Sequence, residues 1–375
     1  DISTWTFPYA FNLECAPVKS VAGLMGDRIE RNDFPQGRLI GGESRVGYVF
    51  ENREFYAPKV VYELQRKGIR VSATNRPFQF KNEEGEWTMG YGTYQVLTHN
   101  QPLPSDVLYA TLGELAKNTG VDIYSANTGL MADVDFGSPA FKPLEQPKVA
   151  MLVGRGVSIP ESGEIWFLLD KRFQMRPVLI ENPSLTGKDL KAYNVIILAN
   201  GVPNLTKGTE TALKEWVAAG GVLIASKQGL ISLKTKETLL EKADSLSVYR
   251  SFADKAEAKA GKLIKGVILN CHLDKTHPLA WGLDQDEIAV IKTNDIIFQK
   301  DRDPYVSPLY YTKKPLLSGF LSADNANLLR EEPAVIVKPY KSGKVIVFAD
   351  DMNFRSYFFG TSKLFMNALF YNKCM

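Results

Sequence analysis

The amino-acid sequence predicts an α/β protein with two α/β domains, the second built on a doubly wound, mostly parallel sheet with a C-terminal hairpin. Short apolar segments of strand length alternate with amphipathic helical segments from residue 46 onward. The stretch 127–147 is rich in Gly, Pro and Asp and has little periodicity, which is typical of a domain boundary. We therefore expect an irregular segment over 1–45, a small domain over 46–143 and a larger domain over 144–375.

The N-terminal segment and the small domain differ in regularity. Aromatic residues at 5, 7, 9 and 11 alternate along the chain, which is the period of a strand. The small domain contains two strand–helix–strand units, and Gly68 and Gly120 end their helices. The expected elements are strand 46–50, helix 58–67, strand 70–74, strand 94–98, a helix capped by Ser105, and strand 121–125.

The larger domain repeats this alternation with more apolar strands. Residues 149–153 have the continuous apolar character of a strand that is buried on both faces of a parallel sheet. Residues 340–343 form a good hairpin turn, and residues 230–262 are predicted to be helix and loop. The other expected elements are helix 163–173, strand 177–180, helix 187–192, strand 194–199, helix 209–219, strand 222–225, strands 265–273 and 287–298, hairpin strands 334–339 and 344–349, and helix 362–370.

Composition and charge exclude several classes of protein. The 375 residues include 45 basic and 42 acidic side chains, a formal net charge of +3, so no nucleic-acid-binding surface is predicted. The apolar runs are far shorter than the roughly 20 residues that a membrane-spanning helix needs. The three cysteines, Cys15, Cys271 and Cys374, are widely separated and odd in number, which argues against a disulfide framework.

The histidines do not form a pattern for metal binding. His99, His272 and His277 are the three in the chain, and none begins a His-x-x-Glu pair. A catalytic zinc usually takes three protein ligands, two of them on one local element. We therefore expect no metal site and no cofactor within this chain.

Residues 222–229 have the form of a strand-to-helix elbow, the turn that exposes a nucleophile in α/β hydrolases. Ser226 and Lys227 stand at its apex, and His272 with Asp274 are the candidates for a base and its orienting acid. In the alternative interpretation, Ser226 and Lys227 cap the following segment and have no chemical role.

Polar side chains follow several predicted strands, at the sheet edge where open α/β folds bind ligands. Asp350 and Asp351 directly follow the last strand, whereas Glu161 and Glu164 share one face at the start of a helix. Acidic side chains at a helix start also stabilise the helix by about 0.3–1 kcal/mol each, and carboxylates after a strand also form simple turns. The candidate ligand-binding residues are Arg155, Glu161, Glu164, Asn200, Asp350, Asp351, Asn353 and Arg355.

Seven short motifs, spread in order over nearly the whole chain, carry a family resemblance. They are DISTWTFP at 1–8, FYAP at 55–58, GVDIY at 120–124, DFGSPAF at 135–141, SGEIWFLLD at 162–170, VFADDMNFR at 347–355 and KLFMN at 363–367. Together they resemble the region that follows the catalytic domain in bacterial zinc-carboxypeptidase-like proteins. The resemblance implies that the zinc ligands and the catalytic glutamate lie upstream, in a domain absent from this sequence.

The second half also resembles the class I glutamine-amidotransferase-like fold, a flavodoxin-like doubly wound domain, through the segment THPLAWGL at 276–283. Active members of that family place a cysteine at the elbow and a His/Glu pair later in the chain. This sequence has Ser226 and Lys227 at the elbow and no cysteine there. The resemblance therefore implies the fold without amidotransferase activity.

Taken together, these resemblances imply a non-catalytic accessory region for binding, docking or assembly. The implied partner is an upstream peptidase domain, which would hold the zinc, and the implied location is exported, periplasmic or at the cell surface. The abundant aromatic residues are compatible with a peptide or glycan ligand. Two alternatives stay open: a hydrolase or transferase that uses Ser226 or Lys227, and an oligomerisation module that forms a homo-oligomer.

Overall fold

The computed structural model describes residues 7–375 except 17, 31–32, 132, 182–183, 202, 230–250, 256–260 and 262. The chain divides into two compact units, Asn12–Leu144 and Glu145–Met375, and the short N-terminal helix α1 (Phe7–Phe11) belongs to the second. Both units combine helices with strands, so the predicted α/β class is confirmed. Within the described ranges, no helix combines the length and apolarity needed to cross a bilayer.

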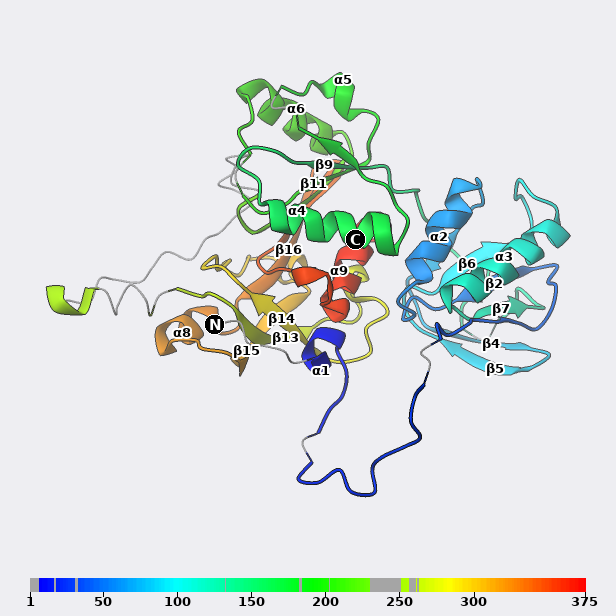
Figure 1. The fold of residues 1–375 in the computed structure, drawn as a ribbon. Helices are drawn as coiled ribbons and strands as arrows, with labels where there is room; N and C mark the ends of the chain where they lie inside the picture. Colours follow the sequence, from blue (N-terminus) through cyan, green and yellow to red (C-terminus); the bar gives the residue numbers. More distant parts are fainter. Residues whose placement is uncertain are drawn as a thin grey trace. The chain divides into compact units, whose positions relative to one another are not determined.

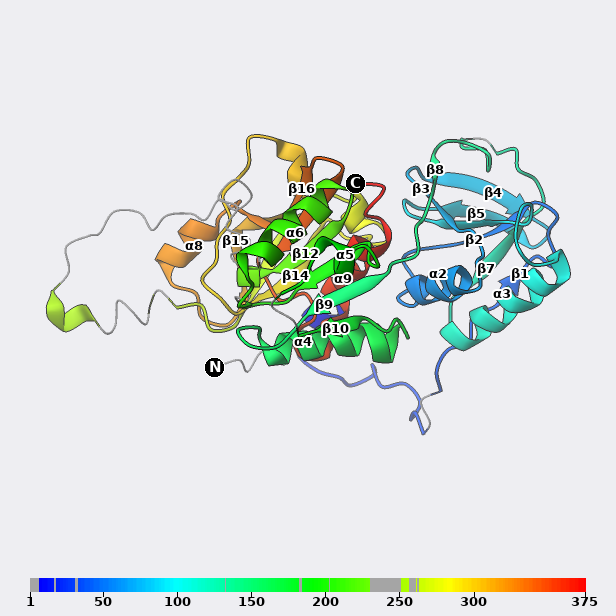
Figure 2. The ribbon, with the colours of Figure 1, turned by 90° about the horizontal axis from the view of Figure 1, so that it is seen from above.

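The first unit contains a six-stranded mixed sheet in the order β1-β7-β2-β6-β3-β8. Helices α2 (Ala57–Arg66) and α3 (Ser105–Thr119) cover one face, and a two-stranded hairpin covers the other (Figures 1 and 2). The strands are β1 (Leu39–Ile40), β2 (Gly47–Phe50), β3 (Ser72–Thr74), β6 (Tyr94–Leu97), β7 (Ile123–Ala126) and β8 (Phe141–Pro143), with hairpin strands β4 (Phe78–Asn82) and β5 (Gly85–Met89). The hairpin buries Phe78, Phe80 and Met89 against the sheet, a pairing that the sequence did not predict.

The second unit is built on a nine-stranded sheet in the order β10-β9-β11-β12-β17-β16-β15-β13-β14. The first five of these strands are parallel and the rest are joined by antiparallel pairs. The parallel strands are β9 (Val149–Leu152), β10 (Val178–Ile180), β11 (Val195–Leu198), β12 (Val222–Ser226) and β17 (Gly343–Phe348). The antiparallel ones are β13 (Val267–Leu273), β14 (Glu287–Lys292), β15 (Leu309–Ser318) and β16 (Pro333–Tyr340).

Helices pack on both faces of this sheet. Helix α4 (Ile159–Trp166), extended by a π-helical turn at Phe167–Arg172, lies on one face. Helices α5 (Gly187–Leu190) and α6 (Lys207–Ala218) lie on the other (Figure 2). The remaining helices are α8 (Ala323–Leu329) and the C-terminal helix α9 (Phe359–Phe370), almost all of whose residues are buried.

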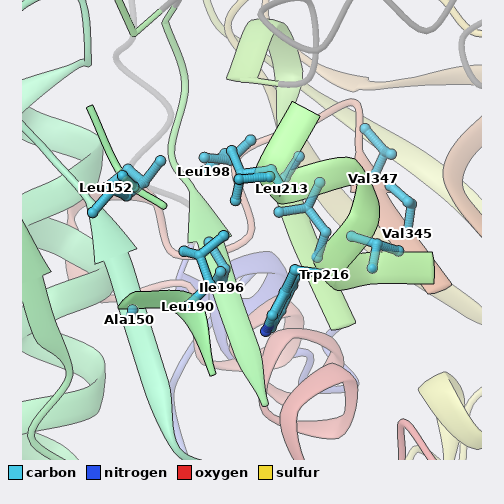
Figure 3. Close-up of a cluster of buried hydrophobic side chains, with 14 of the residues drawn as sticks. Ala150, Leu152, Leu190, Ile196, Leu198, Leu213, Trp216, Val345 and Val347 are labelled. Carbon is cyan, nitrogen blue, oxygen red and sulfur yellow. The ribbon is translucent and has the colours of Figure 1, made fainter. Parts of the chain in front are cut away.

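The core between the parallel strands and α6 shows why these strands are continuously apolar. Ile196 and Leu198 of β11 pack with Leu213 and Trp216 of α6 and with Val347 of β17 (Figure 3). Each fully buried side chain of this kind contributes roughly 1.5–3 kcal/mol. Since the central strands are covered on both faces, their loops are the one part where polar side chains can gather.

Three sequence-based element predictions need correction. The strand predicted over 287–298 ends at Lys292. Residues 7–11 form a helix rather than a strand, because the i and i+4 aromatics Phe7 and Phe11 then share one face, and Phe11 stacks on Phe359 at 4.7 Å between ring centroids. Trp5 lies outside the described residues. The helix predicted from 163 begins at Ile159, because the Ser158 side chain accepts the Glu161 N–H and caps it. Most of the predicted helix and loop at 230–262 also lies outside the described residues.

The strand order defines the edge where a site is expected. From β9 the chain turns to β10 on one side, whereas from β11 it continues to β12 on the other. The carboxyl ends of β9 and β11 therefore flank a topological switch point, the usual ligand position in open α/β sheets. All five parallel strands send their following loops to this same edge.

Candidate functional site

The elbow at 222–229 consists of β12 and the turn 227–229 that follows it, and this turn lies at the carboxyl edge of the sheet. Lys227 adopts a left-handed backbone conformation with φ of 49°, which turns the chain sharply at the strand end. A Cβ at Gly229 would lie 2.6 Å from the Ala199 carbonyl oxygen and 2.7 Å from that of Leu198. The close approach to β11 therefore requires glycine at this position.

The Lys227 side chain points into the protein rather than into solvent. Its Nζ lies 3.1 Å from Glu161 Oε2, 3.1 Å from Thr293 Oγ1 and 3.4 Å from Asp351 Oδ2, and the side chain is only 3% exposed. We call these four residues the elbow cluster. Burial lowers the pKa of Lys227, but the two carboxylates outweigh it, so the net shift is upward. The amine is therefore protonated and has three acceptors.

Two glutamates of α4 border this amine, and burial raises the pKa of both. The pKa of Glu161 rises despite its ion pair with Lys227. The pKa of Glu164 rises to about 8 through burial and then through the negative charge of Asp351. Glu164 Oε1 accepts the Arg355 N–H at 2.8 Å, and Glu164 Oε2 is buried without a hydrogen-bond partner among the described residues. This raised pKa favours the neutral carboxylic acid at pH 7.

A second buried cluster lies beside the first and was not predicted. Lys292, the last residue of β14, is fully buried and its Nζ lies 3.1 Å from Asp350 Oδ1 and 2.6 Å from the Ile296 carbonyl oxygen. The Tyr311 hydroxyl donates to Asp350 Oδ2 at 2.6 Å. We call Lys292, Asp350 and Tyr311 the Lys292 cluster. Asp350 was a predicted candidate, whereas the signal for Lys292 was a lysine directly after four apolar residues of a strand.

The other predicted ligand-binding residues lie around the same edge. Asn353 is 3% exposed, its N–H donates to Asp351, and its Oδ1 has no partner within the described part of the chain. Arg355 has a left-handed backbone with φ of 48° and its guanidinium lies over the Phe354 ring. Asn200 Oδ1 accepts the Gly201 N–H and, at 3.4 Å, the Gln228 N–H.

Arg155 lies apart from the elbow cluster, in the loop after β9. The bridge between Val157 and Gly201 joins this loop to the one after β11, and the Ser158 N–H donates to the Asn200 carbonyl. The switch point is thereby bridged by backbone contacts. The predicted residues therefore divide into a group around Lys227 and a separate one at Arg155.

The proposed Ser226, His272 and Asp274 triad is not assembled. Strand β12 is parallel to β17, and three antiparallel pairings lead from β17 through β16 and β15 to β13. Strand β13 therefore runs opposite to β12, and its end at His272 lies at the other edge of the sheet from Ser226. His272 is exposed, Asp274 accepts the Thr276 hydroxyl, and the Ser226 side chain hydrogen-bonds Glu161. Over the residues that the structure describes, no group of three His, Cys, Asp or Glu side chains has the arrangement of a metal site.

Comparison with known proteins gives only distant structural likeness. No protein-family model matches the chain, and no curated protein matches it. A ThuA-like protein from Bacteroides uniformis is 12% identical, with a TM-score of 0.37, over 59% of this chain and 88% of that one. A cytoplasmic protein from Salmonella typhimurium is 14% identical, with a TM-score of 0.36, over 59% and 97%. A beta-galactosidase from Bacillus circulans is 11% identical, with a TM-score of 0.34, over 58% and 30%. These values are too low to assign a family or a function.

Proposed function

We propose that this chain is a non-catalytic accessory region of an exported zinc-carboxypeptidase-like protein, with a role in binding, docking or assembly. Its second unit is a glutamine-amidotransferase-like domain, and the peptidase domain with its zinc lies upstream. The seven ordered motifs support the family. The observation that carries the lack of catalysis is the buried, ion-paired amine of Lys227 at the elbow.

A lysine acts as a nucleophile only as the neutral amine, which usually requires a lowered pKa. The pKa of Lys227 is shifted upward instead, because Asp351 and Glu161 hold the charged form. Ser226 is 6% exposed and has no imidazole within hydrogen-bond reach among the described residues. At the position that holds the nucleophile in active amidotransferases, this chain therefore has a buried lysine that forms ion pairs with two carboxylates.

The first test looks for covalent chemistry at the elbow. The purified chain, Ser226→Ala, Lys227→Met and the exposed-serine control Ser342→Ala are incubated with a fluorophosphonate and an activated ester. We expect the same background labelling in all four proteins. Labelling in the wild type that Ser226→Ala or Lys227→Met abolishes, with Ser342→Ala unchanged, would establish the hydrolase or transferase alternative.

The second test measures the native protein. An antibody raised against this chain is used on extracts and on the exported fraction of the source organism. We expect a band far above 41.8 kDa, the mass of this chain, because the peptidase domain is attached. A band near 41.8 kDa would contradict the accessory role, as would zinc-dependent release of C-terminal amino acids from peptides by this chain alone.

A further inference from the structure

A small pocket of about 200 Å³ lies at the carboxyl ends of β9 and β10, next to the switch point. Its walls are partly apolar, from Leu152, Ile180 and Leu205. Its polar lining includes Arg155 and Glu181, one after each strand. Pockets for drug-sized ligands are usually about 300–1,000 Å³, so this one fits a smaller molecule. We call it the strand-end pocket.

The two charged side chains of the strand-end pocket are not paired with each other. Both are exposed, and within the described part of the chain neither the Arg155 guanidinium nor the Glu181 carboxylate forms an ion pair or a side-chain hydrogen bond. Exposed charges are common, but here opposite charges face one concave site that also has apolar walls. A ligand that carries both charges would satisfy both.

The Glu181 side chain passes close to Gly154. The φ of Gly154 is 99°, and a Cβ at this position would lie 2.6 Å from Glu181 Cγ and 3.0 Å from Glu181 Oε1. The carboxylate therefore lies directly over the glycine, one residue before Arg155 in the chain. The Val153 N–H also donates to the Ile180 carbonyl at 3.0 Å, which fixes the two strand ends together.

We propose that the strand-end pocket binds a free α-amino acid with an aliphatic side chain. The Arg155 guanidinium would take the α-carboxylate in a two-point, charge-assisted contact, and Glu181 would take the α-ammonium. Leu152, Ile180 and Leu205 would contact the side chain. A simple anion is disfavoured by Glu181 and a simple cation by Arg155, so the pair selects a zwitterion. This names a ligand for the proposed accessory role, on which it rests.

The test is a titration of the whole chain with L-leucine, in which binding is measured by calorimetry and by NMR. N-acetyl-L-leucine, which lacks the ammonium, and L-leucinamide, which lacks the carboxylate, are the comparison ligands. We expect L-leucine to bind at roughly millimolar concentration or tighter, and each comparison ligand to bind at least about tenfold more weakly.

The variants assign each charge to its partner. Arg155→Gln should weaken the binding of L-leucine at least about tenfold and remove the preference for L-leucine over L-leucinamide. Glu181→Gln should also weaken the binding of L-leucine at least about tenfold, and it should remove the preference for L-leucine over N-acetyl-L-leucine. The exposed substitutions Arg302→Gln and Glu215→Gln serve as controls and should leave binding unchanged. Circular dichroism checks that each variant is folded.

Three outcomes would overturn the proposal: no binding of L-leucine to the wild type, equal binding of all three ligands, or preferences that neither variant changes. Binding is measured without any hydrolysis, so such a failure is distinguishable from failure of the proposed function. If the chain is labelled at Ser226 and binds no amino acid, both the proposed function and the pocket proposal are refuted. If the chain is not labelled and binds no amino acid, only the pocket proposal is refuted.

Discussion

Two lysines buried at the same sheet edge differ in the direction of their pKa shift. Lys227 faces two carboxylates, Glu161 and Asp351, and its pKa is raised. Lys292 faces one carboxylate, Asp350, and its pKa is lowered, because complete burial outweighs that single charge. The partners Asp350 and Asp351 are consecutive residues, so one turn after β17 supplies both clusters.

The opposite pKa shifts of the two lysines show how much opposite charge a buried ammonium needs in order to stay protonated. Moving a charge out of water costs several kcal/mol, and one ion pair often fails to offset this. At Lys227 burial also lowers the pKa, but the charges of Asp351 and Glu161 and their hydrogen bonds reverse the balance. At Lys292 the remaining contacts are a carbonyl and the Tyr311 hydroxyl, which stabilise the ammonium less than a second charge would.

The largest expected effect comes from removing the amine of the Lys292 cluster. Lys292→Met keeps the aliphatic volume but leaves the fully buried Asp350 without its cation. Breaking a buried pair in this way usually costs about 3–5 kcal/mol, and we expect that loss in the free energy of unfolding. Urea denaturation at pH 7 measures it, with the exposed Lys265→Met as control.

A double variant separates the charge from the packing. Lys292→Met with Asp350→Asn removes both charges and keeps an acceptor for the Tyr311 hydroxyl, so we expect it to recover more than half of the loss. A single Lys292→Met variant within about 0.5 kcal/mol of the wild type would show that the cluster contributes no more than an ordinary surface position.

A smaller and pH-dependent loss is expected at the elbow. Lys227→Met leaves Glu161 and Asp351 together, but Glu161 already has a raised pKa and can take a proton. We therefore expect a loss of about 2–3 kcal/mol at pH 8, below the range for a pair that cannot neutralise itself. The loss should shrink at pH 5, where protonation removes the repulsion. Equal losses of stability at pH 5 and pH 8 would mean that Glu161 does not take up a proton when the Lys227 amine is removed. The elbow cluster would then respond to loss of its lysine in the same way as the Lys292 cluster.

The comparison also marks the limit of prediction from sequence. The parallel strands were predictable because continuous apolar runs such as 195–198 require burial on both faces. Asp351 was predictable as a strand-end residue, and Glu161 as an acidic residue at the start of a helix. Their shared partner, Lys227, was expected at the apex of a nucleophile elbow. Its side chain points inward to Glu161 and Asp351, which lie 66 and 124 positions away in the chain, and no local pattern encodes such contacts.

Lys292 was missed for a different reason. It ends a strand of the antiparallel part of the sheet. The pairing of β13 with β14 and β15 brings Tyr311 near it, and the bridge between Ile291 and Asp351 brings Asp350 to it. Such contacts join residues 19 and 58 positions apart in the chain. The hairpin β4–β5 was missed for a similar reason. Its aromatic residues are buried only because the hairpin packs on the sheet of the first unit, a contact between distant parts of the chain.

The smallest effect concerns Glu164, the acid without a lysine of its own. Its pKa is raised from near 4.5 to about 8, so between these pH values the folded protein holds a proton that the unfolded chain has released. Stability therefore falls as pH rises through this window. Glu164→Gln keeps the acceptor for the Arg355 N–H and abolishes the titration. Relative to wild type, it should be neutral near pH 4.5 and stabilising at pH 8, by at most about 1 kcal/mol because the side chain is partly screened by solvent.

Melting temperatures of wild type and Glu164→Gln across pH 4.5–8.5 check this, with the exposed Glu215→Gln as the matched control. A flatter profile in Glu164→Gln alone would assign the slope to the proton on Glu164. Parallel profiles for Glu164→Gln and wild type would mean that solvent or Lys227 keeps Glu164 ionised. The surroundings of the elbow cluster would then carry one more negative charge than we infer, and the contrast with the Lys292 cluster would widen, since Glu164 would add a third carboxylate whose charge acts on Lys227.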